Sequence, residues 1–214
     1  MWPLIETTGT ALALGVALAL RPWRLLRGPL LTPALGALVL LPPLWLTPQL
    51  MPEGLRVQFS GASLLVLMLG WPLALPLLAA VALLAWAIGS APALDVLGRF
   101  WWLGVVPATF ALGLGGVLRR WLPPNPFVYT LGRGFLGTAA AVFAGAALMQ
   151  WAHPPAADRA LVAAWLMAWG DAFLTGLLVA VFVAFRPQWL ATWSDARYLR
   201  PPAAQGRDGG PDSG

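Results

Sequence analysis

Long apolar stretches alternate with short polar or arginine-bearing segments along almost the whole chain. A helix needs about 20 predominantly apolar residues to cross a hydrocarbon core of about 30 Å, so such stretches predict membrane-spanning helices. The stretches are 11–20, 29–46, 58–88, 100–118, 127–149 and 160–185. This pattern predicts an all-α, polytopic integral membrane protein with short loops.

The stretch 58–88 is too long for one span, and Gly70, Trp71 and Pro72 divide it into two arms. The first arm, 58–69, has about 12 residues and would reach only about 18 Å as a helix. This arm either spans or re-enters, and a re-entrant arm must line a cavity or be covered by protein. We therefore expect about seven transmembrane helices, one of them short or re-entrant, in a single domain over residues 1–200.

The distribution of arginine predicts the orientation, because cytoplasmic loops carry an excess of basic residues. The chain contains no lysine. With the amino terminus outside, the arginines on the inside are Arg21, Arg24, Arg27, Arg119, Arg120, Arg186, Arg197, Arg200 and Arg207, against Arg56, Arg99 and Arg159 outside. We expect a multi-pass protein of the bacterial inner (plasma) membrane with its C-terminus in the cytoplasm. The tail 201–214, rich in Pro, Gly and Asp, is expected to be disordered there.

The composition excludes several classes of function. Of the 214 residues, 59% are hydrophobic and 10% are charged, which leaves no room for a soluble catalytic domain. The net charge of +5 comes from arginines at helix ends, where they anchor the topology, so we expect membrane lipid and no nucleic acid as a partner. Cysteine is absent, and no serine-hydrolase elbow or phosphate-binding loop occurs. We therefore expect no enzyme activity and assign no cofactor.

A lone carboxylate, Asp171, interrupts the otherwise uncharged stretch 160–185. A charge near the bilayer centre costs about 2.5–3.5 kcal/mol on insertion scales and normally faces a packed interior or a wet cavity. Thr175 lies one helical turn away, and Gln58 is a candidate partner across the bundle. We predict a substrate-binding site formed by Asp171, Thr175 and Gln58, without a metal-ligand set. The alternative is a purely structural hydrogen bond at Asp171.

Three other polar side chains lie in or near predicted spans. Glu6 is expected to be an interfacial residue at a helix start, without a function of its own. His153, beside Pro154 and Pro155, is expected to be a solvated loop residue. Arg133, about two turns into its span, is expected either to snorkel to the headgroups or to pair with a carboxylate.

Several spaced motifs resemble one family of membrane proteins. The segments are 58–62 (Gln-Phe-Ser-Gly-Ala), 70–72 (Gly-Trp-Pro), 122–129 (Leu-Pro-Pro-Asn-Pro-Phe-Val-Tyr), 170–176 (Gly-Asp-Ala-Phe-Leu-Thr-Gly), 185–190 (Phe-Arg-Pro-Gln-Trp-Leu) and 197–199 (Arg-Tyr-Leu). Together they resemble a divergent, proteobacterial branch of the CbiM-like permeases. Those permeases are the substrate-capture components of energy-coupling-factor ABC transporters for cobalt and nickel.

The resemblance implies a seven-span permease that captures a transition metal ion outside and releases it inward. A separate transmembrane coupling subunit and ATPase subunits would supply the energy. The metal-capturing members of the family use histidines where this chain has Trp2 and Gln58. Glutamine is a poor substitute for imidazole in the nitrogen coordination that suits nickel. Two functions stay open: a transport component for a metal ion or another small solute, and a non-transporting scaffold or assembly partner of another membrane complex.

Overall fold

The structure, a computed structural model, describes residues 2–24, 26, 28–50, 59–89, 91–154 and 160–198. These residues form helices and no strand. Six of the helices are long and apolar enough to cross a membrane. The prediction of an all-α, polytopic membrane protein is therefore confirmed. Gln58 and the tail 201–214 lie outside the described residues, so what was expected of them stays a prediction.

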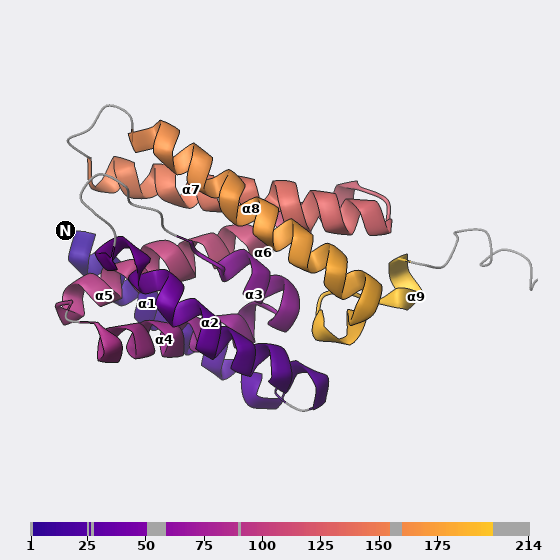
Figure 1. Cartoon of the computed structure of the whole chain (residues 1–214), viewed down its shortest axis with the longest axis horizontal. Coiled ribbons are helices and arrows are strands. Elements are labelled where there is room, and N and C mark those ends of the chain that lie inside the picture. Colours follow the sequence, from indigo (N-terminus) through magenta and orange to yellow (C-terminus); the bar gives the residue numbers. More distant parts are fainter. Residues whose placement is uncertain are drawn as a thin grey trace, which may run out of the picture.

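The spanning segments pack side by side in one bundle (Figure 1). Four of them are single helices: α1 (Trp2–Ala19), α2 (Leu31–Leu50), α4 (Trp71–Ile88) and α8 (Ala160–Phe185). Two are composite, with π-helical stretches: α5 (Ala93–Arg99), η3 (Phe100–Val105) and α6 (Val106–Trp121) form one, and η4 (Val128–Leu136) and α7 (Gly137–Ala152) form the other. The short helices are η1 (Pro22–Arg24), η2 (Gly28–Leu30), α3 (Ala62–Leu69), η5 (Pro187–Trp189) and α9 (Asp195–Tyr198).

Two segments are longer than the hydropathy pattern predicted. The first begins at Trp2, before the apolar run 11–20 and close to the helix start expected at Glu6. Its threonines bond back to the helix: the Thr7 hydroxyl donates to the Pro3 carbonyl at 2.8 Å and the Thr8 hydroxyl to the Leu4 carbonyl at 2.6 Å. The predicted stretch 100–118 begins at residue 93 rather than 100. The added turns form α5, with Asp95 in its first turn and Arg99 in its last. An acidic residue near the start of a helix and a basic residue near its end both interact favourably with the helix dipole.

Contacts between distant helices mark the two ends of the bundle. At one end, called here the N-terminal end, Glu6 near the start of α1 contacts His153 just after α7. α2 also finishes at this end, since Trp45 lines a small hollow together with Trp86 of α4 and Arg99 of α5. The opposite end, where α8 finishes, is called the C-terminal end.

The short helix α3 lies inside the bundle. It has eight residues, or about 12 Å, and is too short to span. Seven of the eight are buried, under cover from α4, α6, α7 and α8. It begins beside Asp171 in the middle of α8 and finishes at the C-terminal end, where Ala191 donates its backbone N–H to the Met68 carbonyl at 2.8 Å. A short arm covered by protein was one of the predicted possibilities.

The chain crosses the bundle between the end of α2 and the start of α4, because these lie at opposite ends. We call the described residues of this connection, 59–69, the broken crossing, and α3 supplies its helical part. Gly70, with φ of 78°, ends α3 and begins α4, so the chain reverses there, as the Gly-Trp-Pro break predicted. The chain thus passes between the two ends seven times: six times as a long span and once as the broken crossing.

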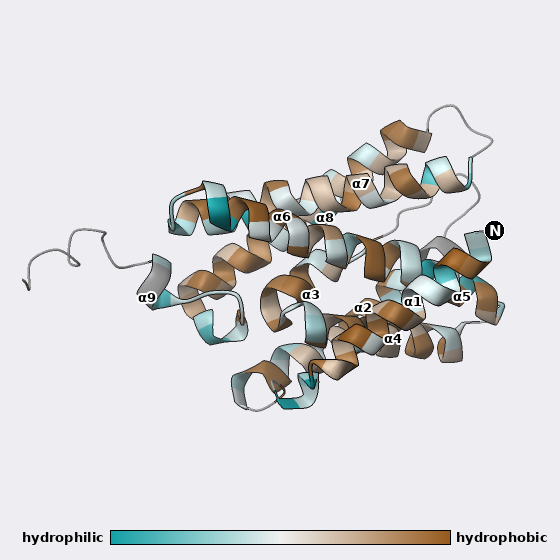
Figure 2. Ribbon diagram, turned by 180° about the vertical axis from the view of Figure 1, so that it is seen from behind, coloured by the Kyte–Doolittle hydropathy of each residue, from teal (hydrophilic) through white to brown (hydrophobic). Residues whose placement is uncertain are grey.

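The outer surface is apolar over most of its height. Figure 2 shows strongly hydrophobic positions along the helices and most of the hydrophilic positions near the two ends of the bundle. Large apolar side chains that point outward include Leu12, Val39, Leu40, Leu83, Val162, Leu166 and Phe173. A surface of this kind is suited to contact with lipid tails.

Candidate functional site

The candidate site is centred on Asp171, near the middle of α8. Its side chain is 1% exposed, whereas Phe173, on the opposite face of the same helix, is 66% exposed. The carboxylate therefore faces the bundle interior while the helix presents apolar groups outward. This is the orientation expected of a charged residue at this depth.

Asp171 holds the start of α3. Its Oδ2 accepts the backbone N–H of Ser60 at 2.9 Å and, over a longer 3.4 Å, that of Gly61. Its Oδ1 accepts the hydroxyl of Thr175 at 3.4 Å. Backbone N–H groups at a helix start favour a negative partner, so the carboxylate both satisfies these donors and complements the α3 dipole.

Ser60 uses every polar group that it has. Its N–H donates to Asp171 and its carbonyl accepts the indole N–H of Trp45 at 3.1 Å. Its hydroxyl donates to the Leu103 carbonyl at 2.6 Å and accepts the N–H of Ala62 at 3.2 Å. The irregular backbone at Ser60 is thus bonded within the protein, as a membrane interior requires.

The bond to Leu103 has a local cause in the sequence. Pro107 lies four residues later and has no N–H, so it cannot donate to the Leu103 carbonyl. The Ser60 hydroxyl takes that place from the broken crossing. The Ser60 hydroxyl on the broken crossing therefore supplies a donor that Pro107 on α6 cannot supply.

Gly61 is required at this point for two reasons. Its φ is +66°, a conformation that residues with a Cβ rarely adopt. A Cβ built there would also lie 2.6 Å from the Leu41 Cδ2. Gly61 thus permits both the turn into α3 and the close approach of α2.

The structure brings together Asp171 and Thr175, two of the three predicted site residues. Gln58, two residues before Ser60, lies outside the described residues, and its role stays a prediction. An apolar cavity of about 310 Å³ adjoins the break, and Gly61 and Leu174 are among the residues that line it. The sequence pattern did not predict a role at this site for Ser60 or Trp45; the motif at 58–62 was the available signal for Ser60.

A second polar cluster lies at the N-terminal end. Glu6 Oε1 accepts the indole N–H of Trp102 at 2.9 Å and contacts His153 Nε2 at 2.9 Å. The Glu6 side chain is 11% exposed and that of His153 is 45% exposed. The Trp2 ring lies 6.0 Å from the imidazole. The expectations of a non-functional interfacial Glu6 and a solvated loop histidine missed this contact, since it joins residues 147 positions apart.

Arg133 does not pair with a carboxylate among the described residues. Its guanidinium lies over the Tyr129 ring, 5.5 Å from the centroid, near the C-terminal end. The position agrees with the snorkelling alternative, in which the stem stays in the bundle and the charged group approaches the headgroups.

Within the described residues, no group of three or more His, Cys, Asp or Glu side chains converges to hold a metal ion. No family model, no curated protein and no solved structure matches this chain. The resemblance to CbiM-like permeases therefore rests on the motifs alone and remains an expectation.

Proposed function

We propose that this chain is a membrane permease component that passes a small solute along the broken crossing. The observation that carries the proposal is the meeting of the start of α3 with the buried Asp171 carboxylate near the middle of α8. Membrane transporters place substrate and coupling-ion sites near the bilayer midplane, where interrupted helices expose backbone polar groups. A bundle that served only to fill the membrane would gain nothing from an interrupted helix at that depth.

Asp171 has two roles in this proposal. In the present conformation it accepts Ser60 and Gly61 and so fixes the start of α3. When the broken crossing moves, the same carboxylate becomes available to a solute. Thr175 and Gln58 then supply hydroxyl and amide groups beside it. A solute that carries positive charge or hydrogen-bond donors suits this set, since such a solute replaces the backbone donors at the carboxylate.

The energy source is expected on other chains. This sequence lacks a phosphate-binding loop, so nucleotide hydrolysis would have to come from a partner. The resemblance to CbiM-like permeases supports a separate transmembrane coupling subunit and ATPase subunits. In the proposed orientation the N-terminal end faces outside and the C-terminal end faces the cytoplasm of a bacterial inner membrane. The ATPase subunits would then act at the C-terminal end.

Cobalt and nickel ions are candidate substrates, but we expect the protein to bind them only weakly. Trp2 and Gln58 replace the two histidines of the metal-capturing members. Calorimetric titration of the purified protein with Ni²⁺ at neutral pH should therefore give weak or no binding. Restoring both ligands with Trp2→His and Gln58→His should raise the affinity for nickel if the chain keeps the family's arrangement.

A non-transporting scaffold is the second candidate function. It is favoured by the hydrogen bonding of Asp171, whose two oxygens already have donors within the protein. A carboxylate with this set can serve purely to fix α3 against α8. The scaffold would then bind another membrane complex through its apolar outer faces.

Purification from native membranes separates the two candidates. The tagged full chain would be isolated in mild detergent, co-purifying chains identified by mass spectrometry, and bound metals measured. Co-purification of a membrane coupling subunit with ATPase subunits supports the permease. Stoichiometric recovery with an unrelated membrane complex supports the scaffold, and recovery of neither rejects the proposed energy coupling.

A further inference from the structure

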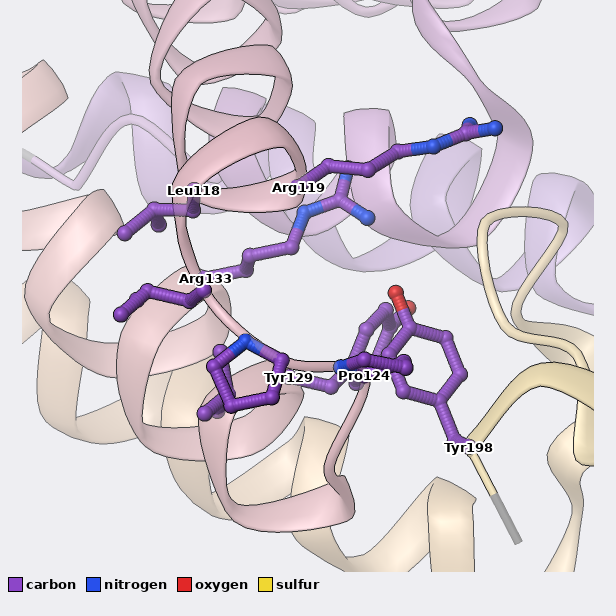
Figure 3. A pocket seen from close by; sticks show the side chains of 9 residues that line it. Leu118, Arg119, Pro124, Tyr129, Arg133 and Tyr198 are labelled. Carbon is purple, nitrogen blue, oxygen red and sulfur yellow. The ribbon is translucent and has the colours of Figure 1, made fainter. Parts of the chain in front are cut away.

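A cavity of about 630 Å³, with polar and basic side chains among its lining residues, lies at the C-terminal end, away from Asp171. It is bounded by α6, by η4 and by the segment 191–198 that follows α8. The residues that give it its chemistry are Gly115, Arg119, Arg133, Thr192, Ser194 and Tyr198. A smaller hollow beside it shares Arg119, Arg133 and Tyr198 (Figure 3).

Two guanidinium groups give this cavity a positive charge. Arg119 lies in the last turn of α6, and Arg133 comes from η4. Figure 3 shows the Arg133 side chain extending toward the stem of Arg119, with Tyr129 and Tyr198 below it. None of the described residues that line the cavity has an acidic side chain. Asp195, on the adjoining α9, accepts the indole N–H of Trp193.

Arg133 has unused hydrogen-bonding capacity. Its Nε is buried and has no hydrogen-bond partner among the described residues. Its guanidinium is held over the Tyr129 ring, which fixes the position of the charge without using the N–H donors. A guanidinium in this condition is suited to an oxyanion, because it offers several donors in one plane.

Gly115 makes room for that guanidinium. A Cβ at this position would lie 2.7 Å from one terminal nitrogen of Arg133 and 3.0 Å from Nε. Any larger residue at 115 therefore displaces the charged group. The neighbouring Gly116 has open space around its Cβ position, so the requirement for glycine is specific to 115.

The opposite wall of the cavity is tied to the broken crossing. The Thr192 hydroxyl donates to the Leu67 carbonyl at 2.8 Å and therefore accepts the Tyr129 hydroxyl, 2.7 Å away. Tyr198 packs on Trp193 with the rings 4.7 Å apart and nearly parallel. The segment 191–198 is thus fastened to α3 and to η4, which gives the cavity a defined shape.

We infer that this cavity binds a phosphate group, and that the phosphate belongs to an anionic phospholipid of the adjacent leaflet. Basic pockets between membrane helices near the bilayer surface are suited to such headgroups. Leu112 lines the cavity and is 46% exposed, so it offers apolar contact to the acyl chains of that lipid. The site is independent of the proposed transport, since it needs neither Asp171 nor a moving crossing.

Native mass spectrometry of the full chain in mild detergent tests this site with phosphatidylglycerol and phosphatidylcholine as probes. Wild type should retain phosphatidylglycerol in preference to phosphatidylcholine. Arg133→Gln should lower the affinity for phosphatidylglycerol by about tenfold or more, since it removes charge-assisted bonds. Arg120→Gln is the matched control, because Arg120 is adjacent to Arg119 in sequence but does not line the cavity.

A glycine pair tests the same site without removing charge. Gly115→Ala should weaken phosphatidylglycerol binding by displacing Arg133. Gly113→Ala should leave it unchanged, because Gly113 has open space around its Cβ position and does not line the cavity. If Arg133→Gln fails to fold, this pair decides the result alone. Equal binding of both lipids by wild type overturns the lipid assignment, and equal losses in Arg120→Gln and Arg133→Gln overturn the site.

Inorganic phosphate separates a lipid from a soluble ligand. Displacement of phosphatidylglycerol by millimolar phosphate, with binding of phosphate alone lost in Arg133→Gln, would support the phosphate site and assign it to a soluble phosphate compound. Retention of the lipid in that competition supports the lipid source. Binding of neither probe overturns the inference.

Discussion

Asp171 on α8 and Ser60 at the start of α3 are joined by a hydrogen bond of 2.9 Å across 111 positions of the chain. Each partner would be costly in the membrane without the other. The carboxylate needs donors at mid-depth, and the non-helical backbone before α3 needs an acceptor. The bond therefore sets the depth at which α3 begins.

Replacing Asp171 with asparagine should weaken this junction while leaving the protein inserted. The amide keeps one acceptor oxygen but presents an N–H₂ group where the carboxylate accepted a second donor. Because hydrogen bonds to a charged group contribute about 1.5–3 kcal/mol each, we expect a loss of stability of that order and loss of any transport activity. Thermal unfolding in detergent, together with uptake by cells, measures the two effects.

Asp195→Asn is the control for Asp171→Asn, because Asp195 is exposed and lies outside the bundle. It should behave as wild type in both measurements. Unchanged stability of Asp171→Asn would show that the bonds to Ser60 and Gly61 contribute little. Unchanged uptake would remove Asp171 from the proposed site.

Gly61→Ala should be strongly destabilising. The new Cβ combines an unfavourable positive φ with an approach of 2.6 Å to Leu41. Each effect costs on the order of 1–3 kcal/mol, so a loss toward the upper part of that range or beyond is expected. Gly36→Ala on α2 is the matched control, because its Cβ position is open. In a helix interior that exchange should be neutral or stabilise by up to about 1 kcal/mol. Equal melting temperatures for the two variants would contradict the role given to Gly61.

The positions of the spans follow from local properties of the sequence and were predicted well. Apolar length located all six long spans, and Gly70 with its neighbours located the reversal after α3. The boundaries were wrong where polar residues continue a helix. The threonines of α1 bond to their own helix carbonyls, and hydropathy counts them only as polar.

The partners at the candidate site depend on tertiary contacts and could not be predicted in this way. The inward orientation of Asp171 followed from the cost of burying a charge in lipid. That Ser60 would be its main donor depends on contacts between distant helices, such as the bond of the Ser60 hydroxyl to the Leu103 carbonyl. Nothing in the spacing of these residues indicates that they meet. The contact between Glu6 and His153 escaped prediction for the same reason.

The absence of cysteine allows a direct test of topology. Single cysteines at Pro154 and Ser194 would lie in exposed positions at the N-terminal and C-terminal ends. If the arginine bias sets the orientation, a membrane-impermeant maleimide should label Pro154→Cys in intact cells. Ser194→Cys should be labelled only after permeabilisation. The reverse pattern would invert the proposed orientation, and labelling of both in intact cells would contradict the single crossing of α8 between the two positions.

Glu6 should stabilise the N-terminal end mainly through Trp102 and only slightly through His153. The Trp102 ring is 6% exposed, so loss of its acceptor leaves a buried N–H unsatisfied, whereas His153 is partly in contact with water. Glu6→Ala should therefore cost about 1–3 kcal/mol and His153→Ala about 1 kcal/mol or less. Glu6→Gln keeps an acceptor for the indole and should retain most of the stability.

Thermal unfolding of the three variants and of the Glu6→Ala/His153→Ala pair measures these contributions. Because removal of Glu6 already breaks both contacts, adding His153→Ala should cost little more. A double variant as unstable as the sum of the single losses would show that Glu6 and His153 act independently, and that the contact at 2.9 Å does not couple α1 to α7.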